Sequence, residues 1–306
     1  MATGRALDTA AVIPVGRRVG ERRGQWRRFA ANRRALAGAL VLAALAASAA
    51  LAPMLAPYDP AEQRAGKAVE PPSLAHPMGT DNFGRDVWSR ALYGGRVSQS
   101  IGLLSMAVSI IVGVVVGGLA GFYGRGCDAA LMRLTETVVT FPTFFLLITL
   151  VAVFGTRLWL LILAIGLTSW PITARVVRAE FLALRERAFV EAARALGARD
   201  VRTIVRHILP NVVPVIVVAA TLRVAYVILV EAGMSYLGVG VPPPTPSWGS
   251  MVAEGREYLF RAWWISFFPG LFIFLTVMTY NLVGDGLRDA FDPRQPAALR
   301  PSRRTT

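Results

Sequence analysis

Lysine, cysteine and histidine are almost absent from this sequence of 306 residues. The single cysteine, Cys127, excludes an intramolecular disulfide, and beside it His76 and His207 are too few to predict a Cys/His metal site. Lys67 is the only lysine, and no serine or threonine follows it directly. A Walker A loop needs Gly-Lys-Ser/Thr, because its lysine must reach the nucleotide phosphates. The chain is therefore not itself a P-loop ATPase.

Charged residues are also scarce, at 17%, whereas hydrophobic residues make up 54% of the chain. A soluble domain of this length carries about a quarter charged residues, so the composition favours a membrane protein over a soluble fold. The charge is strongly positive, with 33 Lys and Arg against 19 Asp and Glu. A nucleic-acid-binding domain would not be mostly apolar, and we expect no nucleic-acid partner. In a membrane protein, such an excess is typical of cytoplasmic segments.

Six stretches have the length and hydrophobicity of membrane-spanning helices, which need about 20 apolar residues. They cover residues 35–56, 98–121, 132–153, 157–177, 211–232 and 264–284. The tail 1–34 has nine arginines and the segment 174–210 has eight, whereas the segment 57–97 has no net charge. Because cytoplasmic segments of membrane proteins are enriched in arginine and lysine, we place the first two segments in the cytoplasm and 57–97 outside. We therefore expect a cytoplasmic tail 1–34, a first transmembrane helix 35–56, an external segment 57–97, a five-helix core 98–285 with a cytoplasmic loop 178–210, and a cytoplasmic tail 286–306.

The N-terminal region allows two interpretations. Its basic tail, apolar stretch and small residues at 46–49 are compatible with a cleaved signal peptide. However, the apolar stretch runs for about 20 residues, and the basic tail is longer than a usual signal-peptide n-region. We favour an uncleaved membrane anchor.

The loop 178–210 has the pattern of a helix, a glycine break and a second amphipathic helix. Ala192 and Ala193 are strong helix formers with small side chains, and Gly197 is suited to end a helix. Apolar residues then recur at helical spacing, at Val201, Ile204, Val205 and Ile208. By pattern alone, such a loop could equally lie on anionic lipid through its arginines.

The order of residues in this loop nevertheless has a close parallel. Glu-Ala-Ala at 191–193, Gly197 and Ile-Leu-Pro at 208–210 resemble the cytoplasmic coupling loop of ATP-binding-cassette (ABC) importer permeases. Residues 76–96, with His-Pro-Met-Gly-Thr-Asp and Gly-Arg-Asp, resemble dipeptide/oligopeptide/nickel-type permeases of the second ("C") subunit. The stretches 231–249 and 281–289 resemble the same group, so the resemblance covers about residues 70–294.

This resemblance implies an all-α polytopic membrane protein with six transmembrane helices of the type I ABC importer permease fold and cytoplasmic N- and C-termini. It implies a non-catalytic subunit in the bacterial inner membrane, surrounded by lipid, that forms a heterodimer with a second permease. Two ATP-binding subunits would bind ATP and Mg, with no cofactor in this chain, and an extracytoplasmic substrate-binding protein would deliver the substrate. Peptides are the expected substrate, with nickel or another small solute as the alternative.

The resemblance also nominates functional residues. The expected ATPase-coupling residues are Glu191, Ala192, Ala193, Gly197, His207 and Pro210. The family's outer segment is matched by Gly79, Thr80, Asp81, Gly84, Arg85 and Asp86. Its charged residues could receive the substrate-delivering protein, or form local caps and ion pairs that orient the second span. For His207, packing and hydrogen bonding are favoured over proton relay.

Arg223 and Glu231 are candidates for the translocation pathway. An unpaired arginine in mid-span costs about 2.5–3.5 kcal/mol on insertion scales, so Arg223 should face protein or water. It could attract a peptide carboxylate, or form a structural ion pair with the other permease chain, which the sequence favours. A proton-driven carrier would need buried carboxylates near the bilayer midplane, but Glu136 and Glu231 lie towards span ends. No hydrolase or metalloprotease motif supports a membrane enzyme.

Overall fold

The protein is built from helices throughout residues 25–292, the part described by the computed structural model, with one isolated β-bridge between Thr80 and Asp86. The long helices are α2 (Arg33–Ala50), α4 (Val87–Tyr123), α5 (Arg125–Thr140), α6 (Thr143–Phe154), α7 (Leu158–Arg185), α10 (Leu209–Tyr236) and α12 (Trp264–Phe291). The short ones are α3 (Ala52–Leu55), α8 (Ala188–Ala195), α9 (Asp200–Arg202) and α11 (Trp248–Gly255). A π-helical turn, Thr203–Ile208, joins α9 to α10, and a 3₁₀ turn, Arg256–Tyr258, follows α11.

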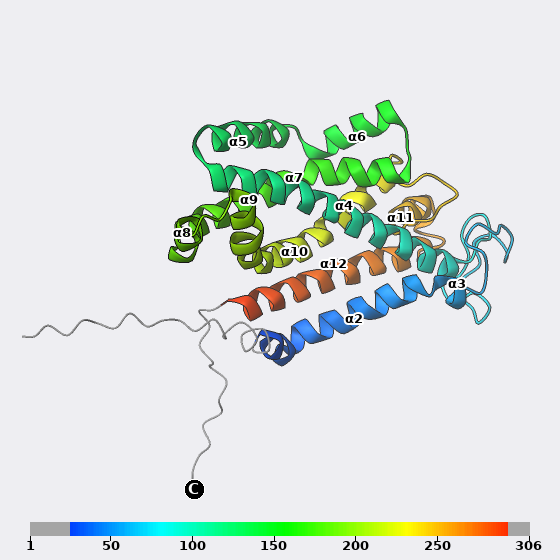
Figure 1. Ribbon diagram of the computed structural model, residues 1–306. Coiled ribbons are helices and arrows are strands. Elements are labelled where there is room, and N and C mark those ends of the chain that lie inside the picture. The colour runs from blue at the N-terminus through cyan, green and yellow to red at the C-terminus, as the bar shows by residue number, and fades with distance from the viewer. Residues whose placement is uncertain (1–24, 293–306) are drawn as a thin grey trace, which may run out of the picture.

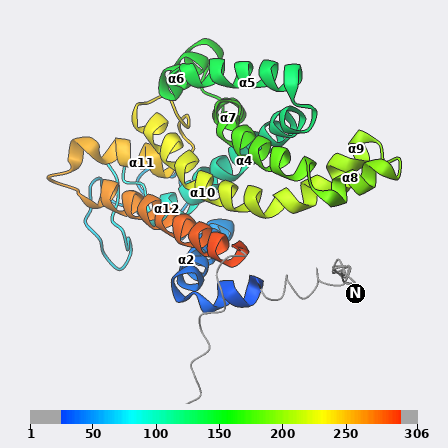
Figure 2. The same ribbon diagram turned by 90° about the vertical axis from the view of Figure 1, so that its left-hand side faces the viewer.

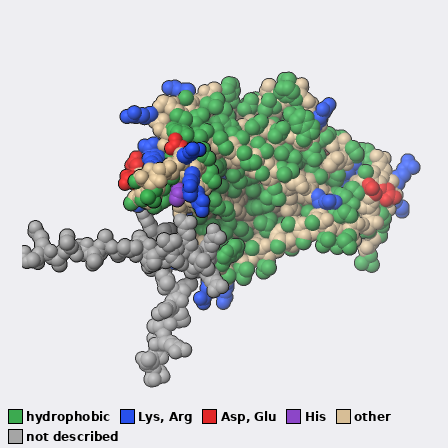
Figure 3. All heavy atoms as spheres, in the orientation of Figure 1, with side chains coloured by type: hydrophobic (Ala, Val, Ile, Leu, Met, Phe, Trp, Pro, Cys, Tyr) green, Lys and Arg blue, Asp and Glu red, His purple; other side chains and the backbone are tan. Residues whose placement is uncertain are grey.

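Five helical runs in the described residues are long and apolar enough to cross a membrane. The pair α5 and α6 makes a sixth if it is taken as one span broken by an 82° bend. The long helices lie side by side (Figure 1), and hydrophobic side chains cover the broad middle of the face in Figure 3, with most charges towards its ends. The predicted all-α, polytopic membrane fold is confirmed.

The ends of the helices agree with the predicted orientation. The start of α2 and the end of α12 lie at the same end of the bundle as α8 and α9 (Figure 1). The loop that follows α3 lies at the opposite end. Both ends of the described chain are therefore on the side of the loop 178–210, which the arginine distribution assigns to the cytoplasm.

The first two spans begin at side-chain caps rather than at the edges of the apolar stretches. The Asn32 side chain accepts hydrogen bonds from the backbone N–H groups of Arg34 and Ala35, each at 3.2 Å, and α2 begins at residue 33. Asp86 accepts one from the Ser89 N–H at 2.7 Å, so α4 begins at Val87. Residues 87–97, predicted to lie in the external segment, are therefore the first turns of the second spanning helix.

Glycines bring α4 and α7 into close contact. Gly113, Gly117 and Gly121 recur every four residues on one face of α4. A Cβ atom added at Gly117 would lie 2.2 Å from the Ala174 carbonyl oxygen, and one at Gly121 would lie 2.6 Å from the Cβ of Phe181. Small residues at this spacing let two membrane helices approach closely without a clash. The two helices therefore form a tightly packed pair at the centre of the fold.

The third span differs from its prediction. The apolar stretch 132–153 predicts one continuous helix, but α5 ends at Thr140 and α6 begins at Thr143 with an 82° change of direction. Pro142 is the cause, because a proline forces the residue before it out of the helical region. Phe141 accordingly has an extended backbone, with φ −79° and ψ 129°. The predicted continuous helix is wrong at this point.

Candidate functional site

Helix α8 carries the Glu-Ala-Ala part of the predicted coupling loop and is anchored to the bundle by one face. Val190 is completely buried in a cluster with Phe122, Phe181 and Ile208, which come from α4, α7 and the π-helical turn. Ala193 is buried as well, at 8% exposure, whereas Ala192 is exposed. Of the two alanines, only Ala192 is therefore open to contact by another protein. Ala193 serves the packing of the loop on its own chain.

An exposed apolar surface follows α8. Leu196 is 88% exposed, Val201 71% and Val205 56%. Gly197 ends the helix with a positive φ of 79°, and a Cβ at this position would have no atom within 4 Å. Of the predicted apolar stripe, only Ile208 is completely buried. The stripe was expected to lie on one face, but the structure buries Ile208 in the bundle and leaves Val201 and Val205 exposed. We call the exposed residues Leu196, Val201 and Val205 the coupling surface.

A π-helical turn links the coupling surface to α10. The N–H of Leu209 donates to the Ile204 carbonyl, five residues back, and Pro210 has no N–H to donate. The Asn211 side chain donates to the His207 carbonyl oxygen at 2.6 Å, which gives this irregular turn a further link to α10. His207 is half-buried beside this turn. From residue 200 to 236 the chain is thus one helical run, and a shift of the loop is also a shift of the end of α10.

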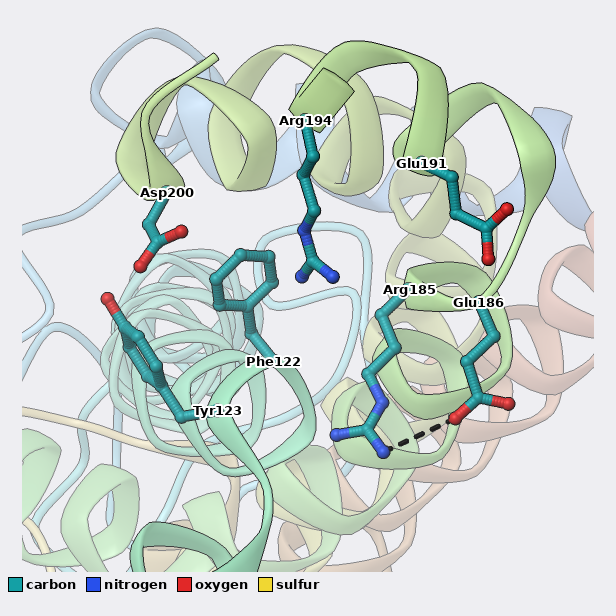
Figure 4. A pocket seen from close by; sticks show the side chains of 7 residues that line it. All are labelled: Phe122, Tyr123, Arg185, Glu186, Glu191, Arg194 and Asp200. Atoms are coloured by element: carbon teal, nitrogen blue, oxygen red, sulfur yellow. Dashed lines mark hydrogen bonds and ion pairs between the residues drawn. The ribbon is translucent and has the colours of Figure 1, made fainter. Parts of the chain in front are cut away.

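A polar hollow of about 460 Å³ lies between α8 and the ends of α4 and α7 (Figure 4). In Figure 4, Arg194 points from α8 towards Phe122 at the end of α4, with its guanidinium carbon 5.0 Å from the ring centre. Arg185 pairs with Glu186 at 3.3 Å beside Glu191. The hollow carries charges of both signs, and Glu191 lies on its wall. Sequence patterns do not predict it, because its lining comes from four helix ends.

The charged residues of the outer segment are buried in an ion-pair network. Arg85 donates to Asp81 at 2.6 Å and to Glu254 at 2.7 Å, and Arg90 donates to Glu254 at 2.8 Å. Asp81, Arg85 and Arg90 are each at most 8% exposed. The network ties the segment before α4 to α11, more than 160 residues further on. Sequence analysis missed Glu254, because no local pattern marks a partner so distant in the chain.

A second cluster orders the start of α4. One oxygen of Asp86 pairs with Nδ1 of His76 at 2.9 Å, and the other accepts from the N–H and hydroxyl of Ser89. Thr80 is buried, and Gly79 and Gly84 both have positive φ, of 74° and 71°. Of the two interpretations of the outer segment, the geometry favours the local one, in which these residues cap and orient the second span.

The two candidate pathway residues lie in different surroundings. Glu231 is completely buried, and it accepts hydrogen bonds from the hydroxyls of Ser98 at 3.0 Å and Ser235 at 2.8 Å. It ties α10 to α4 and has no exposed surface, so its geometry favours a structural role over a place on the pathway wall. Arg223 is half-buried against the ring of Tyr226, 4.5 Å away, on the wall of a hollow in the middle of the bundle. The structure does not bring the two residues together.

Comparison with known proteins identifies the family. Residues 113–295 match the family model described as "Binding-protein-dependent transport system inner membrane component". Residues 22–74 match the "N-terminal TM domain of oligopeptide transport permease C". The first match covers more than half of the chain. The chain therefore belongs to the family of inner-membrane components of binding-protein-dependent transport systems.

Relatives cover nearly the whole chain. It is 45% identical over 268 residues to a putative peptide transport system permease protein of Brucella abortus, covering 88% of this chain and 90% of that protein. It is 41% identical over 275 residues to the di/tripeptide transport system permease protein DppC of Pseudomonas aeruginosa, covering 88% and 91%. Among solved structures, an inward-facing MetNI methionine ABC transporter has a similar fold, with a TM-score of 0.54 and 20% identity over 66% of this chain and 97% of that one.

Proposed function

We propose that the chain is one permease subunit of an ATP-driven importer of di- or oligopeptides in the bacterial inner membrane. In this assembly it pairs with a second, different permease chain and lines half of the translocation pathway. Two ATP-binding subunits dock on the cytoplasmic side and bind ATP and Mg, and an extracytoplasmic protein delivers the peptide. The family match supports the transport role, and the names of the relatives support a peptide substrate over nickel.

The observation that carries the proposal is the coupling surface. Leu196, Val201 and Val205 form an open apolar surface at the end of the bundle, next to a glycine break. Exposed apolar side chains grouped in this way mark protein–protein contacts. The neighbouring α8 is fixed to α4 and α7 by the buried Val190. A partner that grips the surface would therefore move whole helices rather than bend a loose loop.

The mechanism follows from a population shift. ATP binding to the docked subunits favours one arrangement of those subunits, and the coupling surface must follow them. Because the loop continues through the π-helical turn into α10, the movement reaches the middle of the membrane. ATP thereby shifts the permease pair from an inward-open towards an outward-open state. The chain itself contributes half of the pathway and the helical run that transmits the movement, and it carries out no chemical step.

The test is uptake by the reconstituted complex. The chain is co-purified with its permease and ATP-binding partners, placed in liposomes, and supplied with the binding protein and ATP. Labelled dipeptides and oligopeptides are compared with a labelled nickel complex. ATP-dependent peptide uptake is expected. Uptake of the nickel complex alone would overturn the substrate, and uptake driven by a proton gradient without ATP would overturn the transport mechanism.

A further inference from the structure

The break between α5 and α6 leaves a helix N-terminus within the apolar stretch 132–153. Helix α6 begins at Thr143, and no side chain caps its first N–H groups. The N–H groups of residues 143–145 have no partner within the helix, because Leu146 is the first to donate, to the Pro142 carbonyl. Such groups carry a partial positive charge. In the hydrocarbon region, unpaired backbone of this kind is tolerated only where it faces protein or a polar cavity. The N–H groups at the start of α6 therefore need a hydrogen-bond acceptor from outside the helix.

A hollow of about 180 Å³ adjoins this end. Its wall includes Thr143 at the start of α6, Thr168 and Ser169 from α7, and Arg223 and Tyr226 from α10. Residues 168–172 lie near the middle of α7, and Arg223 lies near the middle of α10, so the hollow sits at mid-depth in the bundle. No acidic side chain is among its lining residues in the described part of the chain.

Arg223 has an unsatisfied donor in this hollow. Its Nε atom is buried, and among the described residues it has no hydrogen-bond partner. The contact with the Tyr226 ring, at 4.5 Å, supports the charge but accepts none of the guanidinium hydrogens in the plane of the group. A half-buried, unpaired charge is still costly within a membrane-spanning helix, so Arg223, like the start of α6, is suited to bind an anion. The start of α6 and the Arg223 side chain thus both lie on the wall of this hollow, on different helices.

We propose that this hollow is a carboxylate site, which takes the C-terminal carboxylate of a peptide in transit. The inference rests on the proposed function. The hollow, of about 180 Å³, has room for a carboxylate and the atoms next to it, which suits a site that must also release its ligand. Broken helices whose N-termini face anionic substrates at the midplane are a recurring solution in transporters. Here Arg223 adds a full charge to the helix end.

The competing explanation is an ion pair between Arg223 and a carboxylate of the second permease chain. Such a pair needs neither the helix break nor the hydroxyls that surround the hollow. It would also neutralise the arginine, and the hollow would then show no preference for anions. The two explanations therefore differ in the electrostatic potential inside the hollow of the assembled complex.

The experiment measures that potential with a thiol reporter. In a Cys127→Ser background, Thr143→Cys places the only thiol of this chain on the wall of the hollow, and Val139→Cys gives a second reporter position on the same wall. The partner subunits are used in cysteine-free form. In the reconstituted complex, modification rates are compared for anionic methanethiosulfonate ethylsulfonate and its cationic trimethylammonium counterpart. The ratio of the two rates cancels any change in thiol reactivity.

We expect the anionic reagent to be favoured, and Arg223→Gln to reduce that preference about tenfold while Arg223→Lys keeps most of it. A free dipeptide should slow the modification more than its C-terminal amide does. A rate ratio that Arg223→Gln leaves unchanged, or loss of the second permease chain on that substitution, would overturn the carboxylate site. Peptide uptake by the parent complex is measured alongside. If that uptake is absent while the anion preference remains, the proposed function fails instead.

Discussion

At the residue scale, the outer segment is held by two buried carboxylates that have a partner at every oxygen. Asp81 accepts from the N–H groups of Phe83 and Arg85 with one oxygen and from the Arg85 side chain with the other. Asp86 is shared between His76 and Ser89. Removal of one partner from such a cluster leaves the others buried and unsatisfied, which costs more than the bond itself contributes. Substitution of any of these residues should therefore lower the stability of the fold strongly.

Replacement of Asp86 tests this directly. Asp86→Ala removes the cap of α4 and the partner of His76, and we expect the free energy of unfolding to fall by about 1–2 kcal/mol. The midpoint of thermal unfolding in detergent measures the change. Glu62→Ala is the control, because Glu62 is exposed in the same segment. An equal midpoint for both variants would contradict the capping role.

Glu231 provides a second test, which separates stability from transport. Glu231→Ala should destabilise the fold by about 3 kcal/mol, because it leaves a cavity and two buried hydroxyls without their acceptor. Glu231→Gln keeps the shape and one acceptor, so it should unfold nearer to the parent and transport normally. Thermal unfolding and uptake per folded complex are measured together. A stable Glu231→Gln variant without uptake would restore Glu231 to the pathway.

At the scale of elements, helix type and number follow from hydrophobic length, but helix ends and bends do not. The stretch 98–121 predicts the second span, yet Asp86 starts that helix at Val87. Pro142 lies within the apolar stretch 132–153, whose composition alone conceals the break. Likewise, the spacing of the stripe from Val201 to Ile208 indicates a helix, but tertiary packing decides which side is covered. Motif position was predictable, whereas burial depended on contacts between distant segments.

The close contact of α4 with α7 leads to a prediction for glycine. Gly117→Ala would place a methyl group 2.2 Å from the Ala174 carbonyl oxygen, so the helices must separate, and we expect a clear fall in thermal stability. Gly126→Ala is the matched control, because a Cβ there has no atom within 4 Å and alanine favours a helix. A Gly117→Ala variant as stable as the control would show that the two helices are not tightly packed.

At the scale of the whole molecule, structural features group at three depths. The outer end carries the buried ion-pair network, the middle carries the hollow beside Arg223, and the cytoplasmic end carries the coupling surface. Figure 1 shows α8 and α9 at one end of the long helices and the loop after α3 at the other, and Figure 2 shows the helices from the end of α8 and α9. Helix α10 and its continuation from residue 200 run from the coupling surface past Arg223 to Glu231. One helical run thus connects the coupling surface with the middle of the bundle.

The coupling surface is the part of this arrangement most open to test by substitution. Leu196→Asp places a charge on a side chain that is 88% exposed, so it should leave the fold of the chain intact. If the surface docks on the ATP-binding subunits, this charge must be buried without a partner, and binding should weaken at least tenfold. Leu74→Asp is the control, because Leu74 is fully exposed in the loop that follows α3, and that loop lies at the other end of the bundle (Figure 1).

The most direct measurement of the central claim is peptide-dependent ATP hydrolysis and uptake in liposomes, compared between the parent complex and the Leu196→Asp and Leu74→Asp variants. The account predicts that Leu196→Asp loses both activities together with co-purification of the ATP-binding subunits. Leu74→Asp should retain co-purification and ATP-driven uptake. Full uptake and normal co-purification in the Leu196→Asp complex would contradict the account.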